Sequence, residues 1–190
     1  MNYEERYAAY LQAIEEYLSG LFTADKPYAR LYESMRYSVL SGGKRIRPVL
    51  TLEFARLGGI DWHLALPYAC ALELVHNYSL IHDDLPCMDN DDMRRGKPSN
   101  HKVYGENYAL LAGDGLLTKA FETALSSEAF RNVGMERAAY AAAVLARCAG
   151  EYGMVGGQCI DLATENRTVS LDELCEKDTG KTQTSSWQHA

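Results

Sequence analysis

The chain has 190 residues, 47% hydrophobic and 24% charged, which is typical of a globular protein large enough for one domain with a core. Its 26 acidic and 19 basic residues give a net charge of −7, which argues against nucleic acid as the main partner. The longest apolar run, 138–145, is too short to cross a bilayer, and the acidic start is unlike a secretory signal. The five cysteines lack the spacing of a zinc site, so we expect free thiols in a reducing cytoplasm.

Apolar residues recur with helical spacing along most of the chain. The pattern predicts helices over 3–18, 28–40, 46–57, 62–84, 104–125, 135–150, 152–164 and 171–177. Asp61 is a good N-cap for the fourth of these helices; Pro67 is expected to bend that helix and Pro86 to end it. Residues 85–100 are predicted to form a loop, and no convincing strand alternation occurs. We therefore predict an all-α helical bundle, with no linker that divides it into two domains.

The strongest functional signal is the run from Leu80 to Gly96, which reads LIHDDLPCMDNDDMRRG. Five carboxylates lie within ten residues, and two arginines follow directly. Acids at this density repel one another unless a positive charge lies between them. Oxygen ligands of this kind suit Mg²⁺, and the planar guanidinium groups of arginine grip phosphate oxygens. The run therefore predicts a site for a magnesium-bound diphosphate.

The position of the first two acids supports this interpretation. Asp83 and Asp84 fall at the C-terminal end of a predicted helix, where the helix dipole disfavours negative charge and a bound cation would reverse the effect. A solvated acidic loop is the ordinary alternative. His76 and Ser79 precede Asp83 by seven and four residues and so share its helical face. An anion-binding histidine and an ordinary packed histidine both fit this spacing.

A second basic segment, GGKRIRP, covers residues 42–48. Two glycines let the backbone approach a ligand closely, and helix N-termini attract anions. Lys44 and Arg47, three residues apart at the helix start, share a face. The segment lacks the spacing of a P-loop. A glycine cap followed by a basic helix start explains the same residues without a ligand.

Several ordered motifs carry a resemblance to a known family. They are GGKRIRP at 42–48, LVHNYSLIHDDLPCMD at 74–89, RRGKP at 94–98, AGDGLL at 112–117, GGQCIDL at 156–162 and GKT at 180–182. On these motifs the chain resembles the trans-isoprenyl diphosphate synthases, the polyprenyl synthetase family, and most of all the bacterial farnesyl type. The resemblance implies a bundle of the isoprenoid synthase type that works as a homodimer and joins isopentenyl diphosphate to dimethylallyl or geranyl diphosphate.

The resemblance also implies roles for particular residues. Mg²⁺ would be held against the allylic diphosphate by three carboxylates, those of Asp83, Asp84 and Asp89, with Arg94 on the same diphosphate. Isopentenyl diphosphate would be bound by Lys44, Arg47, His76 and Arg95. The allylic side would be completed by further residues of later motifs, namely Lys181 as a phosphate ligand, Thr182, Gln158 and Asp161.

Two residues before the acidic run bear on product length. Tyr78 and Ser79 lie five and four residues before Asp83, and five residues of helix correspond to about 7.5 Å. In the family, a bulky residue at the former position usually stops chain growth at the farnesyl length. The resemblance therefore implies that Tyr78 closes the tunnel and that the product is farnesyl diphosphate. The longer D-D-x-x-x-x-D spacing also matches plant geranylgeranyl diphosphate synthases, which remain an alternative.

The end of the sequence departs from the family pattern. The family has a second aspartate-rich motif downstream of GKT, whereas residues 183–190 are the polar QTSSWQHA. We expect 1–182 to be the N-terminal part of a polyprenyl synthetase domain that lacks its C-terminal helices, and 183–190 to be an aberrant, frameshifted tail. Impaired activity is the expected consequence. A non-catalytic diphosphate-binding or partner subunit is an alternative, whereas two basic patches weigh against a terpene cyclase.

Overall fold

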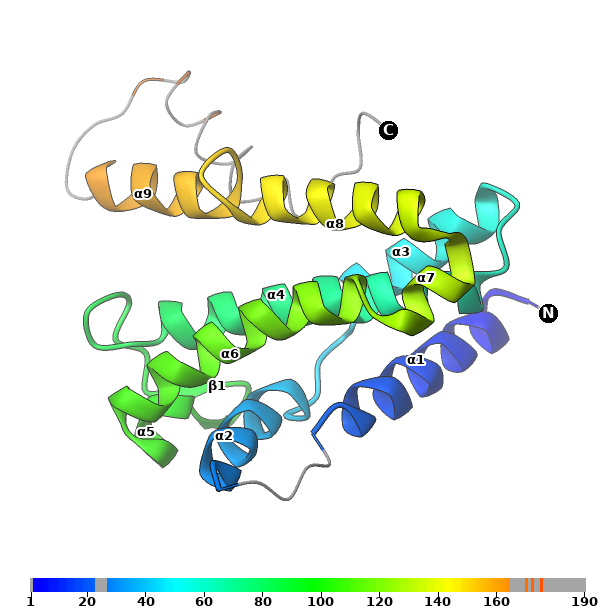
Figure 1. Cartoon of the computed structure of the whole chain (residues 1–190). Helices are drawn as coiled ribbons and strands as arrows, with labels where there is room; N and C mark the ends of the chain where they lie inside the picture. Colours follow the sequence, from blue (N-terminus) through cyan, green and yellow to red (C-terminus); the bar gives the residue numbers. More distant parts are fainter. Residues whose placement is uncertain (1, 23–26, 165–169, 171, 173–174, 176–190) are drawn as a thin grey trace. The chain divides into compact units, whose positions relative to one another are not determined.

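The computed structural model describes residues 2–22, 27–164, 170, 172 and 175 (Figure 1). By its internal contacts the chain falls into two compact units, Met1–Gly134 and Met135–Ala190, and each is described by itself. The elements of the first unit are α1 (Tyr3–Gly20), α2 (Ala29–Val39), α3 (Ile46–Leu57), η1 (Trp62–Ala65), α4 (Leu66–Asp83), β1 (Met93–Arg94), β2 (Lys97–Pro98), α5 (Asn100–Tyr104), α6 (Glu106–Ala124) and α7 (Ser127–Val133). The all-α prediction is confirmed.

Local sequence explains where α1 begins and which face it buries. The Asn2 side chain accepts from the backbone N–H of Glu5, and the Glu5 carboxylate accepts from that of Asn2, each at 2.9 Å. This capping box satisfies two backbone donors that the first turn leaves open. Tyr10, Ile14 and Leu18 recur every four residues and are buried. The helix therefore presents one apolar stripe to the core.

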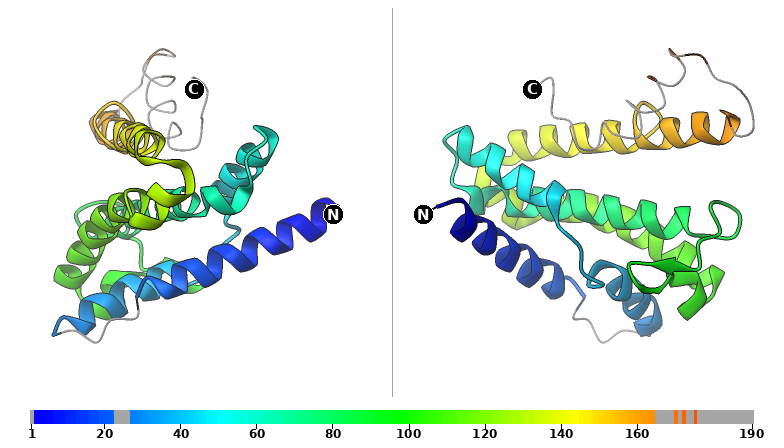
Figure 2. Two further views of the ribbon diagram at one scale, coloured as in Figure 1. Left: turned by 45° about the vertical axis from the view of Figure 1, so that its right-hand side comes forward. Right: turned by 180° about the vertical axis from the view of Figure 1, so that it is seen from behind.

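Helix α4 is the central element of the first unit. Eleven of its residues are buried, and it packs against α6, α3, α1 and α2 (Figures 1 and 2). Its closest neighbour is α6, which turns the small residues Ala109, Ala112 and Gly113 inward. Small side chains at a helix contact let two backbones approach. The polar residues Glu73, His76 and Asp83 extend from α4.

The structure corrects the predicted role of Pro67. The expected single helix 62–84 is divided into the 3₁₀ turn η1 and α4, and Pro67 lies in the first turn of α4. Proline is favoured there because the first-turn N–H has no helical partner to lose. Pro67 therefore starts a helix and does not bend one. The Asp61 cap is confirmed, because its carboxylate accepts from the backbone N–H of His63 at 3.1 Å.

Residues 85–100 contain a small hairpin that the sequence pattern did not predict. β1 and β2 pair antiparallel, with Met93 opposite Pro98. The two turn residues, Arg95 and Gly96, have φ angles of 98° and 78°, and positive φ at both positions is the requirement of a type I′ turn. Strands of two residues are too short to show alternation, which is why the hairpin was missed.

The remaining helices follow the prediction with two corrections. Helix α5 was not predicted; Gly105, at φ 88°, separates it from α6, which lies close to the predicted range 104–125. The short helix α7 was not predicted; Ser126 caps it by accepting from the backbone N–H of Ala129 at 3.1 Å.

The second unit contains α8 (Met135–Ala149) and α9 (Met154–Thr164), close to the predicted ranges. A tight turn joins them, and a Cβ at Gly153 would lie 1.9 Å from the Cys148 carbonyl oxygen, so only glycine fits there. The predicted helix over 171–177 lies largely outside the described residues, as does the 183–190 tail. No described helix has both the length and the apolar character that a membrane span requires. All five cysteines are free thiols, as expected.

Candidate diphosphate site

The first unit contains a cavity of about 450 Å³ between α3, α4 and the hairpin. It is lined by Ser41, Gly42, Gly43, Lys44, Arg45, Ile46, Arg47, Glu73, His76 and Arg95. The four residues expected to bind isopentenyl diphosphate, Lys44, Arg47, His76 and Arg95, are all among them. Three separate segments of sequence supply these four side chains, so the fold brings together what the motifs only implied. We call this space the cation cavity.

Glycine backbone brings the hairpin arginine to the loop before α3. Gly42 and Gly43 have φ angles of 84° and 146°, which side chains other than hydrogen rarely allow. The Arg95 guanidinium donates to the Gly42 carbonyl oxygen. A Cβ at Gly43 would lie 3.0 Å from Nη1 of Arg95, tighter than an ordinary contact. The glycine pair therefore makes room for Arg95 at the edge of the cation cavity.

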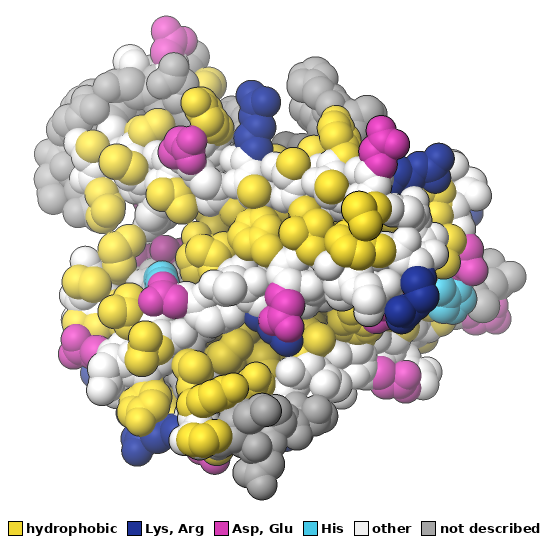
Figure 3. Space-filling view, in the orientation of Figure 1, with side chains coloured by type: hydrophobic (Ala, Val, Ile, Leu, Met, Phe, Trp, Pro, Cys, Tyr) yellow, Lys and Arg dark blue, Asp and Glu magenta, His cyan; other side chains and the backbone are white. Residues whose placement is uncertain are grey.

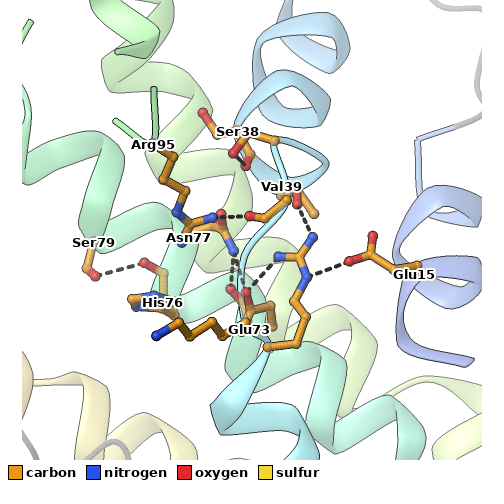
Figure 4. A network of polar contacts seen from close by, with 12 residues as sticks. Glu15, Ser38, Val39, Glu73, His76, Asn77, Ser79 and Arg95 are labelled. Atoms are coloured by element: carbon orange, nitrogen blue, oxygen red, sulfur yellow. Dashed lines mark hydrogen bonds and ion pairs between the residues drawn. The ribbon is translucent and has the colours of Figure 1, made fainter. Parts of the chain in front are cut away.

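Arg45 lies between two predicted ligands, Lys44 and Arg47, and has a different role. Its side chain is buried and donates to Glu15 at 2.7 Å, to Glu73 at 2.8 Å and to the Val39 carbonyl oxygen at 2.7 Å (Figure 4). Its φ of 47° is left-handed, a conformation that costs a non-glycine residue about 1–2 kcal/mol. Sequence reasoning assigned Arg45 no role, because neither its partners nor its backbone conformation shows in the local pattern.

The electrostatics of the cation cavity favour an anion. Burial, together with the positive charges of Arg47 and Arg95, lowers the pKa of His76 to about 3, so the imidazole is neutral near pH 7. Burial also lowers the pKa of Arg95. Cationic groups crowded in a partly dry space destabilise one another, and a bound anion would reverse that effect.

Ser79, predicted on the face of Asp83, is committed to its own helix. Its hydroxyl donates to the His76 carbonyl oxygen at 2.9 Å. Its expected contribution to product length therefore rests on position alone.

The acidic turn, residues 83–92, follows α4 directly. Asp84 is buried, and its carboxylate accepts from Nε of Arg94 at 3.0 Å and from Nη2 of the same residue. The hydrogen bond to Asp84 raises the pKa of Arg94. The backbone N–H of Asp89 donates to the Asp83 carbonyl oxygen at 2.9 Å, which closes the turn and brings these residues together. The Asp89 side chain is exposed.

The carboxylates of the acidic turn provide suitable donors for magnesium but are not gathered into a ligand cluster. Within the described residues no three His, Cys, Asp or Glu side chains converge as a metal site. The chemistry of the donor set nevertheless fits Mg²⁺, which uses one or two protein carboxylates together with substrate phosphates. Asp83, Asp84 and Asp89 lie on one closed turn and provide such oxygens. Arg94, expected on the diphosphate, pairs with Asp84.

Tyr78, the predicted length-limiting residue, is buried on α4 with 7% of its surface exposed. Burial raises the pKa of its phenol, and the Asp83 charge adds to the effect. Its ring meets the His82 ring edge-on, with the centroids 5.5 Å apart. A bulky, buried ring at this place on α4 is what the length prediction requires.

His82 and Gly113 form a close contact that motif reasoning passed over. The Nε2 atom of His82 lies 3.0 Å from the Leu110 carbonyl oxygen on α6. A Cβ added to Gly113 would lie 2.1 Å from that same nitrogen. The glycine of the AGDGLL segment therefore makes room for a histidine that directly precedes the acidic turn.

Four predicted residues are not part of this geometry. Gln158 lies on α9, in the second unit, together with Asp161. Lys181 and Thr182 lie outside the described residues. Their roles stay predictions.

Comparisons with known proteins agree with the motifs. A farnesyl diphosphate synthase of Geobacillus stearothermophilus is 50% identical over 169 residues, covering 86% of this chain and 54% of the relative. A chloroplastic geranylgeranyl pyrophosphate synthase of Catharanthus roseus is 52% identical over 146 residues, covering 76% of this chain and 40% of the relative. The chain thus spans about half the length of these curated relatives.

Solved structures and the family description point the same way. The crystal structure of an FPP/GFPP synthase from Zymomonas mobilis matches with a TM-score of 0.89 at 38% identity, covering 95% of this chain and 66% of that one. The predicted isoprenoid synthase fold is therefore confirmed. The family model described as polyprenyl synthetase matches residues 28–190. On these motifs, this fold and this match, the chain belongs to the polyprenyl synthetase family.

Proposed function

We propose that the protein is a prenyltransferase that condenses isopentenyl diphosphate with dimethylallyl or geranyl diphosphate to give farnesyl diphosphate. The observation that carries the proposal is the cation cavity, in which Lys44, Arg47, His76 and Arg95 line one space of about 450 Å³. A volume of this size is within the range of small-ligand pockets, about 300–1,000 Å³. Its charge selects a compact, multiply charged anion.

The cation cavity would bind isopentenyl diphosphate. The ammonium group of Lys44 and the guanidinium groups of Arg47 and Arg95 would donate to phosphate oxygens, which arginine can do with two parallel bonds. His76, neutral because of its lowered pKa, would donate one further N–H. Held in this way, the diphosphate fixes the position of the isopentenyl double bond, and such positioning is a large part of the rate gain of a two-substrate reaction.

The acidic turn would bind the allylic diphosphate by way of Mg²⁺, held by Asp83, Asp84 and Asp89. Magnesium supplies Lewis-acid stabilisation of the charge that develops on the leaving diphosphate. Arg94 orients the Asp84 carboxylate by the bonds described above. In the reaction, the allylic C–O bond breaks with its electron pair on the diphosphate, the isopentenyl double bond attacks the allylic carbon, and a proton is lost.

Incorporation of radiolabelled isopentenyl diphosphate tests the proposal. With geranyl diphosphate and Mg²⁺ we expect labelled farnesyl diphosphate, formed at the impaired rate expected from the sequence, and with excess chelator no product. Binding of isopentenyl diphosphate without incorporation would support the alternative of a non-catalytic diphosphate-binding or partner subunit. Absence of both binding and incorporation would overturn the proposal.

Product length has its own test in Tyr78. Replacing this buried ring by alanine opens space on α4 one and a half turns before the acidic turn. We expect Tyr78→Ala to shift the product from farnesyl toward geranylgeranyl and longer diphosphates, measured by chromatography of the dephosphorylated products. Ser79→Ala tests the second length residue; it removes only a hydroxyl that is bonded within α4, so we expect a much smaller shift in product length than from Tyr78→Ala. An unchanged product from Tyr78→Ala would contradict the assignment.

A homodimer is the proposed assembly. Leu110 and Leu111 on α6 are 48% and 52% exposed, and Figure 3 shows apolar side chains on the face that carries this helix. Contiguous exposed apolar surface is typical of faces that other chains cover. Light scattering of the purified protein tests the assembly, and a monomer at all concentrations would contradict it.

A further inference from the structure

One carboxylate lies in the wall of a cavity that otherwise carries positive charge. Glu73, on α4, lines the cation cavity with four cationic side chains, those of Lys44, Arg45, Arg47 and Arg95. Its exposure is 3%. A buried acid in such a place has two unfavourable consequences for an anionic ligand. It repels the ligand directly, and it competes with the ligand for the same cations.

The Glu73 carboxylate accepts hydrogen bonds from two neighbouring side chains. Its Oε1 atom accepts from Nη1 of Arg45 at 2.8 Å and from the Asn77 side chain at 3.3 Å (Figure 4). Burial lowers the pKa of the Arg95 guanidinium, and the charge of Glu73 opposes that effect without outweighing it. Arg95 and Lys44, which line the same cavity, are therefore the cations with which Glu73 could pair if Arg45 did not hold it.

Arg45 is itself fixed on three sides. Besides Glu73, its guanidinium donates to Glu15 of α1 and to the backbone of Val39 at the end of α2. Burial lowers the pKa of Arg45, and the bonds to Glu15 and Glu73 outweigh that effect, so its pKa is raised. A guanidinium with these partners keeps its charge and has little freedom to turn toward a ligand.

We propose that Arg45 and Glu73 are positioning residues of the diphosphate site: Arg45 holds the Glu73 carboxylate so that Lys44, Arg47 and Arg95 stay available to the anion. The inference rests on the proposed function only for its ligand class, a diphosphate. Arg45 neither touches the ligand nor serves only to join helices. It keeps the Glu73 carboxylate from pairing with the other cations of the cavity.

This role predicts opposite effects for the two members of the pair. Without Arg45, the freed carboxylate pairs with Arg95 or Lys44, and diphosphate affinity falls. Without the carboxylate charge, Arg45 keeps Glu15 as its partner and the cavity gains one net positive charge, so affinity is unchanged or rises. Removing both charges relieves the competition, so the double variant recovers affinity that the Arg45 variant alone loses.

Calorimetric titration with inorganic diphosphate tests this pattern. The variants are Arg45→Met, Glu73→Gln and the double variant, each checked for folding by circular dichroism and thermal unfolding. We expect Arg45→Met to weaken binding about tenfold, a change of about 1.4 kcal/mol. Glu73→Gln should bind diphosphate as well as or better than wild type. The double variant should regain most of the affinity that Arg45→Met loses and bind within about threefold of wild type.

Glu53→Gln is the matched control. Glu53 accepts from Arg56 at 2.7 Å, from Arg6 at 3.4 Å and from Tyr10 at 2.8 Å, yet it does not line the cation cavity. Its loss should lower thermal stability and leave diphosphate affinity unchanged. A comparable loss of affinity here would show that any weakened helix contact has the same effect, and would overturn the inference.

The remaining outcomes are also decisive. If Glu73→Gln binds diphosphate more than threefold weaker than wild type, or if the double variant binds no better than Arg45→Met, the inference is wrong. If Arg45→Met does not fold, the isosteric Glu73→Gln decides alone, because its amide oxygen can still accept from Arg45. Failure of the proposed function looks different: wild type binds inorganic diphosphate and shows the same variant pattern, but incorporates no isopentenyl diphosphate.

Discussion

The cation cavity and the acidic turn lie next to each other and carry opposite charge. They also differ in how far the chain alone holds their ligand-binding groups in place. In the cation cavity, Arg95 is bonded to the Gly42 backbone and Arg45 to three acceptors, so these two guanidinium groups are in place before any ligand binds. In the acidic turn, Asp84 pairs with Arg94 while the Asp89 side chain is exposed. One site is formed by the chain alone, and the other has its donors close together but not converged.

The difference follows from electrostatics. Guanidinium groups can be fixed by backbone carbonyls and carboxylates that the chain itself supplies, and long side chains can spread the charge. Short carboxylates have no such freedom. Three of them brought to one point repel strongly until a cation joins them, so the chain alone cannot hold them there. Isopentenyl diphosphate binding should therefore be independent of Mg²⁺, and allylic diphosphate binding should require it.

The largest expected effect concerns Asp83 of the acidic turn. Asp83→Asn should lower the rate of condensation by about 10²–10³-fold, the size seen when one group that stabilises developing charge is removed. Its affinity for isopentenyl diphosphate should match wild type, since the cation cavity is untouched. Incorporation assays and calorimetry measure the two quantities.

Asp92→Asn is the control for that comparison. Asp92 is an exposed acid of the same turn and pairs with Lys102 at 2.7 Å, outside the proposed ligand set. It should retain most of the wild-type rate. Equal losses of rate in the two variants would mean that only the total negative charge of the turn matters. The assignment of individual magnesium ligands would then be wrong.

A smaller effect is expected where α6 supports the acidic turn. Gly113→Ala places a Cβ 2.1 Å from the His82 nitrogen, so the imidazole or a helix must move. Overpacking of this kind costs about 1–3 kcal/mol in the free energy of unfolding, and thermal or urea unfolding measures it. Gly115→Ala on the same helix is the control. Its Cβ would lie 3.1 Å from the flexible Met35 side chain, which can yield, so we expect nearly unchanged stability. Equal destabilisation would contradict the special role of Gly113.

The residues of the cation cavity differ in how far sequence predicts their roles. Lys44, Arg47, His76 and Arg95 were assigned from the family motifs, and they line one cavity. The role of Arg45 in holding Glu73 was missed. Its partners Glu15 and Glu73 are 30 and 28 residues away along the chain, and only tertiary packing brings them together. Motif spacing identifies residues that share a helix, but it cannot show which neighbour holds a side chain.

The fold shows the same limit at a smaller scale. Helix α3 was predicted to the residue, because glycine pairs at 42–43 and 58–59 bound its apolar segment locally. The β1–β2 hairpin was missed, since it depends on a two-residue turn with Arg95 at φ 98°, a conformation that sequence does not favour for arginine. Tertiary contacts to Gly42 support that turn.

The smallest predicted effect is the pH dependence that His76 gives to stability. Its pKa is about 3 in the folded chain against an ordinary value of 6.5, so the unfolded chain binds the proton more readily between these values. Stability from this residue is therefore fully present above pH 6.5 and is lost as pH falls toward 3.

His76→Gln should remove that part of the slope, seen as a flatter dependence of unfolding free energy on pH between 6.5 and 4 than in wild type. Saturating inorganic diphosphate should flatten the wild-type curve as well, because an anion beside Arg47 and Arg95 favours the protonated imidazole and raises its pKa. The acidic turn offers no such effect without Mg²⁺. If diphosphate left the wild-type slope unchanged while it bound, the anion would lie away from His76, and the cation cavity would not be its site.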